Sequence, residues 1–299
     1  MCGIAGIVLN DSFVEKQNLL KMLPGIAHRG PDGQGFFLNG GVGFLHKRLS
    51  IIDTSEEANQ PLYNESKSLV LICNGEIYNH SQLRNELMKR GHHFSCNSDS
   101  EVLLHLYEEY RAQPSQMLDK LKGMFAFAIY DIPNKVLFLA RDRFGIKPLY
   151  YTQHNSNFYF ASEVTSLVDA LEGEVQLDHT SLFEYYQYLS IPEPNTIYKS
   201  IKTLLSGHFA VVKNGNVAIS KWYGLEDVVE SCQDNLTSYT NELRDAIDQS
   251  VVQHLVADVP VGSFLSAGID STLVSHLASR HSSLMTISAG FPGEPEDES

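Results

Sequence analysis

Long apolar runs and basic residues are both scarce in this sequence. No stretch of about 18 apolar residues occurs, and the N-terminus has neither the basic nor the long apolar region of a secretory signal peptide. The 22 Lys and Arg residues are outnumbered by 36 Asp and Glu residues, and the formal net charge is −14. These absences argue against a membrane protein and against nucleic acid or an anionic membrane as a partner.

Cysteine is also rare. The four cysteines, at positions 2, 73, 96 and 232, show neither metal-ligand spacing nor a disulfide framework. We therefore expect a reduced, cytoplasmic protein without a metal site. The content of 43% hydrophobic and 19% charged residues is typical of a globular protein, and 299 residues suggest about two domains.

The second residue of the chain is a cysteine, Cys2. If Met1 is removed, the thiol and a free α-amine belong to the same residue. A thiol with a pKa of about 8.5 is a poor nucleophile at neutral pH, and an α-amine with a pKa of about 8 can accept its proton. The apolar residues at 4–9 predict a buried strand that holds this terminus rigid. The pattern favours a catalytic nucleophile, and the alternative is an incidental cysteine.

Periodicity and composition divide the chain into two parts. Helices are predicted at 14–26, 80–90, 100–110 and 181–189, and strands at 43–46, 68–73, 124–130, 136–141, 149–152 and 158–162. An Asn214-Gly215 turn is predicted to join two short strands. The acidic stretch 224–236 is predicted to link a first domain, 1–223, to a second, 237–299.

The second part contains a strand, a loop of small residues and a helix. The strand is predicted within 259–265, the loop at Ser266–Ser271, the helix up to Arg280 and a further strand at 284–288. This arrangement presents backbone N–H groups to a phosphate. The alternative is an ordinary strand-to-helix turn.

Nine short motifs together resemble one enzyme family. They are CGI at 2–4, RGPDG at 29–33, RLSIID at 48–53, QPL at 60–62, NGEIYN at 74–79, SDSE at 98–101, GMFAF at 123–127, RDRFG at 141–145 and ASE at 161–163. Their order and spacing are similar to those of the glutamine-hydrolysing asparagine synthetases, and the loop at Ser266–Ser271 looks like the pyrophosphate loop of that family's second domain. The resemblance extends over essentially the whole chain.

The resemblance implies an α+β fold. The first domain is expected to be an N-terminal-nucleophile glutaminase with four αββα layers, in which two antiparallel sheets lie between helical layers and Cys2 starts a central strand. The second is expected to be the truncated beginning of an α/β ATP-pyrophosphatase domain.

The resemblance also implies how glutamine is held and attacked. Cys2 is the nucleophile, while the Asn74 side chain and the Gly75 backbone N–H stabilise the oxyanion. The carboxylate of glutamine is expected to bind Arg48, and its ammonium group Asp99 with Glu76. The backbone of Leu49, Ile51 and Ile52 is expected to line the pocket.

Each of these roles has a simpler alternative. Arg48 is alternatively a surface ion-pair residue, Asp99 a helix N-cap, and Asn74-Gly75 a turn. A further set of charged residues is interpreted as structural ion pairs: Arg29, Asp32, Arg141, Asp142 and Arg143.

The implied second reaction uses ammonia from glutamine to convert aspartate to asparagine, with ATP and Mg²⁺ as cofactors. The residues expected to bind ATP are Leu265, Ser266, Gly268, Asp270, Ser271 and Ala289. The resemblance is compatible with a homodimer. The alternatives are an amidotransferase with another acceptor, and a glutaminase-only or non-catalytic paralogue.

The sequence departs from the family pattern at two places. The family's loop reads Ser-Gly-Gly-x-Asp-Ser, and Ala267 replaces its first glycine; a Cβ at a position with positive φ costs about 1 kcal/mol, which argues against ATP binding. The sequence also ends at Ser299, so we expect glutamate release without asparagine synthesis by these residues. Four apolar residues are then expected to be exposed: Phe264, Leu265, Val274 and Leu277.

Overall fold

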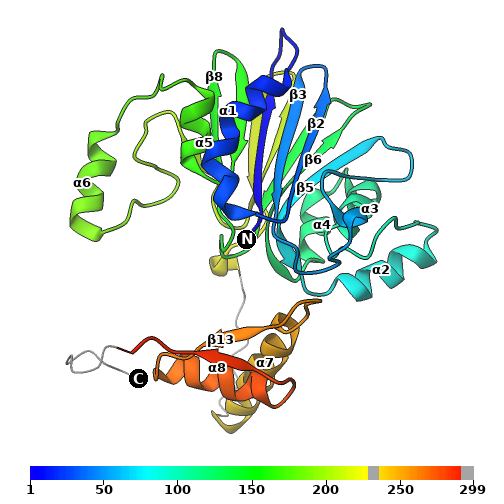
Figure 1. Cartoon of the computed structure of the whole chain (residues 1–299), viewed down its shortest axis with the longest axis vertical. Helices are drawn as coiled ribbons and strands as arrows, with labels where there is room; N and C mark the ends of the chain where they lie inside the picture. The colour runs from blue at the N-terminus through cyan, green and yellow to red at the C-terminus, as the bar shows by residue number, and fades with distance from the viewer. Residues whose placement is uncertain (228–235, 291–299) are drawn as a thin grey trace. The chain divides into compact units, whose positions relative to one another are not determined.

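The computed structural model describes residues 1–227 and 236–290, which belong to two compact units, Met1–Val228 and Val229–Ser299 (Figure 1). Most of the stretch predicted to be a linker, and Cys232 within it, lies outside the described residues. None of the helices in the described ranges is long and apolar enough to cross a membrane.

The first sheet of the first unit has β1 near its middle. Its order is β10-β8-β9-β1-β3-β2, and β1 pairs antiparallel with both β9 and β3. The strands are β1 (Gly3–Val8), β2 (Gly33–Asn39), β3 (Val42–Arg48), β8 (Tyr150–His154), β9 (Asn157–Ala161) and β10 (Lys202–Thr203). Because β1 is flanked on both edges, the residue that precedes it, Cys2, begins a central strand as expected.

The second sheet is also antiparallel, with the order β12-β11-β7-β6-β5-β4. The strands are β4 (Leu62–Tyr63), β5 (Leu69–Ile77), β6 (Gly123–Asp131), β7 (Val136–Arg141), β11 (His208–Lys213) and β12 (Asn216–Lys221). Asn214 and Gly215 join the last two strands with φ values of 50° and 76°, the left-handed conformation that a two-residue hairpin turn requires.

Helices cover the outer faces of the two sheets (Figure 1). Helices α1 (Lys16–Ile26) and α5 (Val164–Ala170) pack on the first sheet, and α2 (His80–Lys89), α3 (Val102–Tyr110) and α4 (Pro114–Asp119) pack on the second. A third core, which includes Ile4, Phe44, Val70 and Ile72, lies between the sheets. These layers confirm the expected four-layer αββα architecture.

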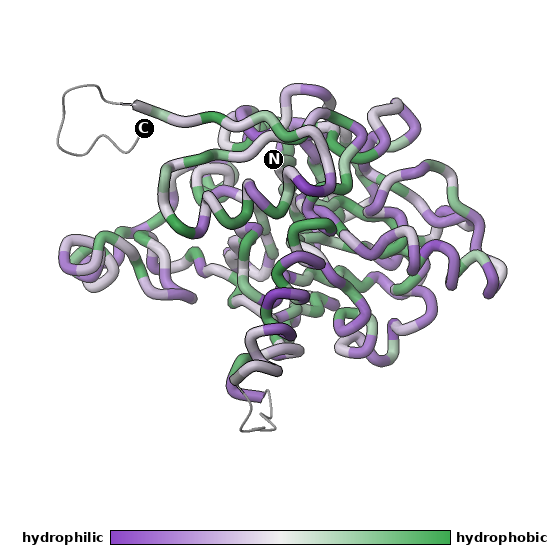
Figure 2. Tube along the Cα trace, turned by 90° about the horizontal axis from the view of Figure 1, so that it is seen from below, coloured by the Kyte–Doolittle hydropathy of each residue, from purple (hydrophilic) through white to green (hydrophobic). Residues whose placement is uncertain are grey.

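Helix α6 (His179–Tyr188) stands away from the two sheets in both views (Figures 1 and 2). The Asp178 side chain caps it by accepting hydrogen bonds from the N–H groups of Thr180 and Ser181. Its aromatic side chains remain largely exposed, among them Phe183 at 69% and Tyr186 at 76%.

The second unit contains the expected strand, loop and helix. Strand β13 (Gly262–Phe264) pairs parallel with β14 (Met285–Ile287), and α8 (Ile269–Ser279) connects them. Helix α7 (Leu236–His254) packs against α8 through a small core that includes Val251 and Leu277. Figure 2 shows apolar residues in the strand that leads to the C-terminal grey trace.

The expected exposure of apolar residues is confirmed for Phe264, which is 80% exposed, and for Val274, at 44%. It is wrong for Leu277, because α7 covers this side chain and leaves it 6% exposed. Leu265 is half-buried.

Candidate functional site

Cys2 lies at the end of the sandwich where β1 begins. Side chains alternate between the faces of a strand, so Cys2 shares a face with Ile4, which lies in the core between the sheets. The Cys2 sulfur is held by the backbone of Leu49: the Leu49 N–H donates to Sγ at 3.3 Å, and the Sγ–H donates to the Leu49 carbonyl at 3.5 Å. The side chain of Arg29 donates to the Cys2 carbonyl at 2.8 Å. The nucleophile candidate is therefore fixed on both its backbone and its side chain.

The electrostatic environment of the thiol is mixed. Burial raises the pKa of Cys2, while the Leu49 N–H and the positive N-terminus oppose that shift. Asp99 raises the same pKa and Arg48 lowers it, so both charges act on the sulfur. Met1 occupies the N-terminus here, so the Cys2 nitrogen is a peptide nitrogen, not an amine. The pKa of the Met1 amine is lowered by burial.

Asn74 faces the same inter-sheet space from the second sheet. It lies within β5, on the face that carries Val70 and Ile72, and is 1% exposed. Its amide nitrogen Nδ2 is buried and has no hydrogen-bond partner in the described structure. A buried N–H donor without a partner is costly, so its presence points to an acceptor that arrives with a ligand. The alternative that Asn74-Gly75 forms a turn is wrong, because both residues pair with β6.

Gly75 has a structural reason to be glycine. A Cβ at this position would lie 2.3 Å from the backbone oxygen of Met124 and 2.6 Å from the Cα of Phe125. Glycine at this position therefore lets β5 and β6 lie close together.

Arg48 at the end of β3 is buried, so the alternative of a surface ion-pair residue is wrong. Its Nη1 donates to the Ser55 carbonyl at 2.7 Å and to Asn59 Oδ1 at 2.9 Å, and its Nη2 donates to the Asp53 carbonyl. Three of the five guanidinium N–H groups thus hold the loop at 53–59. The Nε–H and one Nη2–H are the donors left for a carboxylate.

Asp99 is a buried carboxylate that holds the end of β5. Its Oδ2 accepts from the Ile77 N–H at 2.7 Å, and its Oδ1 accepts from Ser100 Oγ at 3.4 Å. Burial raises the pKa of Asp99. Residue 101 is the cap of α3, so the interpretation of Asp99 as its N-cap is wrong. Glu76 lies on the same β5 face as Asn74 and is half-buried.

The segment at 49–52 passes beside the cysteine without regular structure. Asp32 accepts from the Ser50 N–H at 2.8 Å and thereby fixes this segment. Leu49 touches the sulfur through its backbone, and Ile51 and Ile52 are half-buried.

The predicted structural ion pairs are confirmed for two arginines, Arg29 with Glu163 and Arg141 with Glu193. They are wrong for Asp32, Asp142 and Arg143. Asp32 instead accepts from the Ser50 N–H. Asp142 instead accepts four backbone N–H groups, from Phe125, Phe144, Ile146 and Lys147. Arg143 donates to the Leu121 carbonyl and lies 4.9 Å from the centre of the Trp222 ring.

Two buried residues near this site were missed by the sequence analysis. The Lys147 ammonium group donates to the Met1 sulfur at 3.3 Å, and burial lowers the pKa of this lysine. His46 lies between the sheets, where its Nε2 is 3.2 Å from the Cys73 carbonyl and burial lowers its pKa to about 3. A neutral His46 therefore links β3 to the strand that carries Asn74. Neither residue belongs to a spacing pattern that indicates such a place.

The small-residue loop of the second unit leads into α8. Ser271 Oγ donates to the Gly268 carbonyl at 3.1 Å and lies 3.2 Å from the Ser266 nitrogen. Gly268 is the N-cap of α8 and provides no side-chain cap, which leaves the first N–H groups of the helix to other acceptors. Ala267 has a φ of 56°, so it adopts the left-handed conformation at the cost expected for a residue with a Cβ. Asp270 and Ala289 are exposed.

Comparison with known proteins places the chain in a family. The model of the family described as "Glutamine amidotransferase domain" matches residues 1–223. The chain belongs to the glutamine amidotransferase family. A second model, described as "Asparagine synthase", matches residues 242–299.

Curated glutamine-hydrolysing asparagine synthetases match most of the chain. Glutamine-hydrolysing asparagine synthetase 1 of Bacillus subtilis is 41% identical over 97% of this chain and 46% of its own length. Asparagine synthetase B of Escherichia coli is 33% identical over 99% of this chain and 50% of its own length. The chain thus spans about half the length of these relatives. The resemblance to glutamine-hydrolysing asparagine synthetases is confirmed.

The fold recurs in a solved glutamine amidotransferase. The glutamine phosphoribosylpyrophosphate amidotransferase of Bacillus subtilis, in complex with ADP and GMP, matches with a TM-score of 0.58 at 18% identity. The match covers 96% of this chain and 65% of that one. It confirms the expected fold.

Proposed function

We propose that the first unit hydrolyses glutamine to glutamate and ammonia, with Cys2 as the nucleophile. The observation that carries the proposal is the buried Asn74 Nδ2, a donor with no partner among the described residues, on the inter-sheet face that Cys2 also shares. A preorganised donor of this kind stabilises the charge that develops on a carbonyl oxygen during attack. The family membership of residues 1–223 supports the same reaction.

The proposed reaction proceeds in two acyl-transfer steps. After removal of Met1, the α-amine of Cys2 accepts the thiol proton, and the sulfur attacks the side-chain carbonyl carbon of glutamine. The oxyanion is stabilised by Asn74 and the Gly75 N–H, and it collapses with cleavage of the C–N bond. The nitrogen leaves as ammonia with the proton from the amine. Water then attacks the thioester and releases glutamate and the thiol.

The two charged ends of glutamine select it over other amides. Arg48 retains two N–H donors toward a carboxylate, and Asp99 with Glu76 provides negative charge for the ammonium group. Because burial raises the pKa of Asp99, a substrate cation offsets the cost of its ionised form.

For the second unit we propose the ATP-dependent use of that ammonia, with aspartate as the acceptor. The support is the match of residues 242–299 and the names of the relatives. The loop can hold a phosphate through Gly268 and the first turn of α8, whose N–H groups have no side-chain cap, although Ala267 adopts its left-handed backbone at the cost of a Cβ. Bound ATP with Mg²⁺ would activate the acceptor carboxylate, and Asp270, the carboxylate within the loop Ser266–Ser271, would help to hold the ion.

Intact-mass analysis and a matched pair of variants test the glutaminase. We expect the active protein to begin at Cys2, and we expect Cys2→Ala to abolish glutamate release while the unfolding midpoint stays near that of the parent. Cys96→Ala is the control, because this cysteine lies elsewhere, next to Glu101, and its loss should leave turnover intact. Full activity with Met1 retained, or glutamate release by Cys2→Ala, would contradict the proposal.

A further inference from the structure

We propose that Glu65, His92, His105 and Glu108 form a binding site for a divalent transition-metal ion of the zinc type. One nitrogen or oxygen atom from each of the four lies within 4.8 Å of the others. Glu65 follows β4, His92 lies between α2 and α3, and His105 and Glu108 are three residues apart on α3. The site is on the helical side of the second sheet.

Three of the distances between ligand atoms are close to those of tetrahedral coordination. Zinc binds imidazole nitrogen and carboxylate oxygen at about 2.0–2.2 Å, so neighbouring ligand atoms of a tetrahedron lie about 3.3–3.6 Å apart. The Nδ1 atoms of His92 and His105 are each 3.4 Å from Glu108 Oε2. His105 Nδ1 is also 3.7 Å from Glu65 Oε2. These separations leave room for an ion between the ligands and exceed an ordinary hydrogen bond.

Burial without partners is the second observation. His105 is fully buried, yet neither of its ring nitrogens has a hydrogen-bond partner in the described structure. Glu108 Oε2, which lies 3.4 Å from the Nδ1 atoms of both histidines, is likewise buried and has no hydrogen-bond partner among the described residues. Leaving three such atoms unpaired is costly, and a shared cation satisfies His105 Nδ1 and Glu108 Oε2 together.

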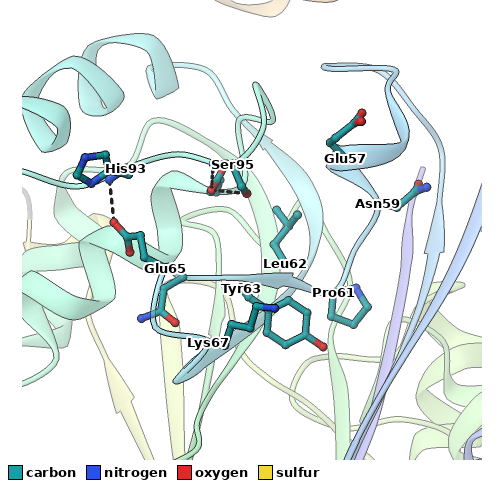
Figure 3. Close-up of a pocket in the computed structure, with 11 residues that line it drawn as sticks. Glu57, Asn59, Pro61, Leu62, Tyr63, Glu65, Lys67, His93 and Ser95 are labelled. Atoms are coloured by element: carbon teal, nitrogen blue, oxygen red, sulfur yellow. Dashed lines mark hydrogen bonds between the residues drawn. The ribbon is translucent and has the colours of Figure 1, made fainter.

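The surrounding residues hold the ligands in the orientation that a metal requires. Asn64 Nδ2 donates to Glu108 Oε1 at 2.7 Å and leaves Oε2 toward the histidines. His92 presents Nδ1 to the site while its Nε2 is 3.0 Å from Glu109 Oε1, the carboxylate–histidine arrangement common behind metal ligands. The backbone N–H of His93 donates to Glu65 Oε1 at 2.7 Å, a bond drawn in Figure 3.

A cavity lies beside the cluster and is lined by one of its ligands, Glu65. A cavity of about 330 Å³ is lined by Asn64, Glu65, His93 and Glu101, among other residues. Figure 3 shows Glu65 and His93 on its wall. The cluster itself is less open, because the His92 side chain is 14% exposed and that of His105 is 0%.

The donor set indicates the class of ion. Imidazole nitrogen favours zinc and its neighbours over magnesium and calcium, which prefer oxygen ligands alone. Four protein ligands also close the coordination sphere, which is typical of a structural site and not of a catalytic one. An ion there would join the segment after β4, the edge strand of the second sheet, to α3. Helix α3 follows the loop that carries Asp99. Cysteine spacing predicted no metal site, and these four ligands contain no cysteine.

Metal binding by the full chain tests the proposal. The Cys2→Ala protein serves as the parent so that the reactive thiol does not compete for the metal. After chelator treatment and gel filtration, Zn²⁺ is added, and bound metal is measured by mass spectrometry and by competition with a zinc indicator. His92→Gln and Glu108→Gln change two ligands that are not fully buried, and His93→Gln is the control, because its exposed ring lies next in sequence but outside the cluster.

We expect about one Zn²⁺ per chain in the parent and the control. Both ligand variants should bind at least about 100-fold more weakly, more than the loss typical of an outer-shell partner. Zn²⁺ should raise the unfolding midpoint of the parent and control alone, and Co²⁺ should give the visible spectrum of a tetrahedral nitrogen–oxygen site. Equal affinity in parent and His92→Gln, or a thiolate charge-transfer band with Co²⁺, would overturn the proposal.

Discussion

Replacement of Asn74 by alanine tests the central feature of the proposed glutaminase. Asn74 Nδ2 is buried and has no hydrogen-bond partner in the part of the chain that the structure describes, so it need not break a hydrogen bond to reach a developing oxyanion. Removal of one such preorganised donor lowers turnover by about 100- to 1,000-fold, or about 2.7–4 kcal/mol of transition-state stabilisation. We therefore expect a fall of this size in kcat, with a small change in KM. Asn74→Asp should lose at least as much, because its carboxylate repels the oxyanion.

The stability of Asn74→Ala, unlike its turnover, should change little. Asn74→Ala removes no hydrogen bond from Nδ2, so its unfolding midpoint should stay close to that of the parent. Asn79 is a matched control from the same motif: its Nδ2 donates to the Lys120 carbonyl at 2.9 Å, and its Oδ1 accepts from the Lys122 N–H at 2.9 Å. Asn79→Ala should lose about 1 kcal/mol of stability for each bond and keep its kcat.

The assay follows glutamate release at saturating and at limiting glutamine, with thermal unfolding recorded on the same preparations. If Asn74→Ala changed KM alone and left kcat intact, Asn74 would be a substrate-binding residue and not an oxyanion donor. If it lowered the unfolding midpoint as much as Asn79→Ala did, its amide would have a structural partner. Either result would refute the reasoning from the unpartnered donor.

Two further predictions concern the charged ends of glutamine. Burial raises the pKa of Asp99 in the folded protein. Below the usual pKa range of aspartate the carboxyl is protonated in both the folded and the unfolded chain, and it costs no stability. As the pH rises from that range through the raised pKa, the folded protein loses stability. Asp99→Asn should therefore keep or raise the unfolding midpoint at neutral pH, while KM for glutamine rises about 10-fold or more; unchanged KM would contradict the ammonium-binding role. Arg48→Ala should raise KM by a similar factor and also lower the unfolding midpoint, because three bonds to the loop at 53–59 are lost. A drop in stability with normal KM would assign Arg48 to the loop alone.

Local pattern was enough to predict much of the first unit. The apolar residues at 4–9 predicted a strand, and β1 forms at Gly3–Val8 with its residues buried. Helices α2 and α6 begin and end within two residues of their predicted bounds. These elements were predictable because their residue spacing and caps are local properties. The short motifs, by their resemblance to a known family, also indicated the four layers and the place of Cys2.

Local pattern was not enough where a distant segment decides the conformation. The dipeptide Asn74-Gly75 is typical of a turn, yet it continues β5, because β6 pairs with it and comes too close for any Cβ at the glycine. Asp142 looked like an ion-pair residue, and it is surrounded instead by backbone N–H groups. Packing outweighs local preference at such positions.

The sequence by itself determined which chemical groups the chain carries and which elements bear them: a thiol at the start of a strand, an amide near the end of another, and a loop before a helix. Only the tertiary structure decided which of these groups meet and which are left without partners. Asn74 and Cys2 lie on strands far apart in the chain, and the cluster around His105 joins residues from 65 to 108. Their environment depends on strand pairing and core packing, which no local spacing encodes.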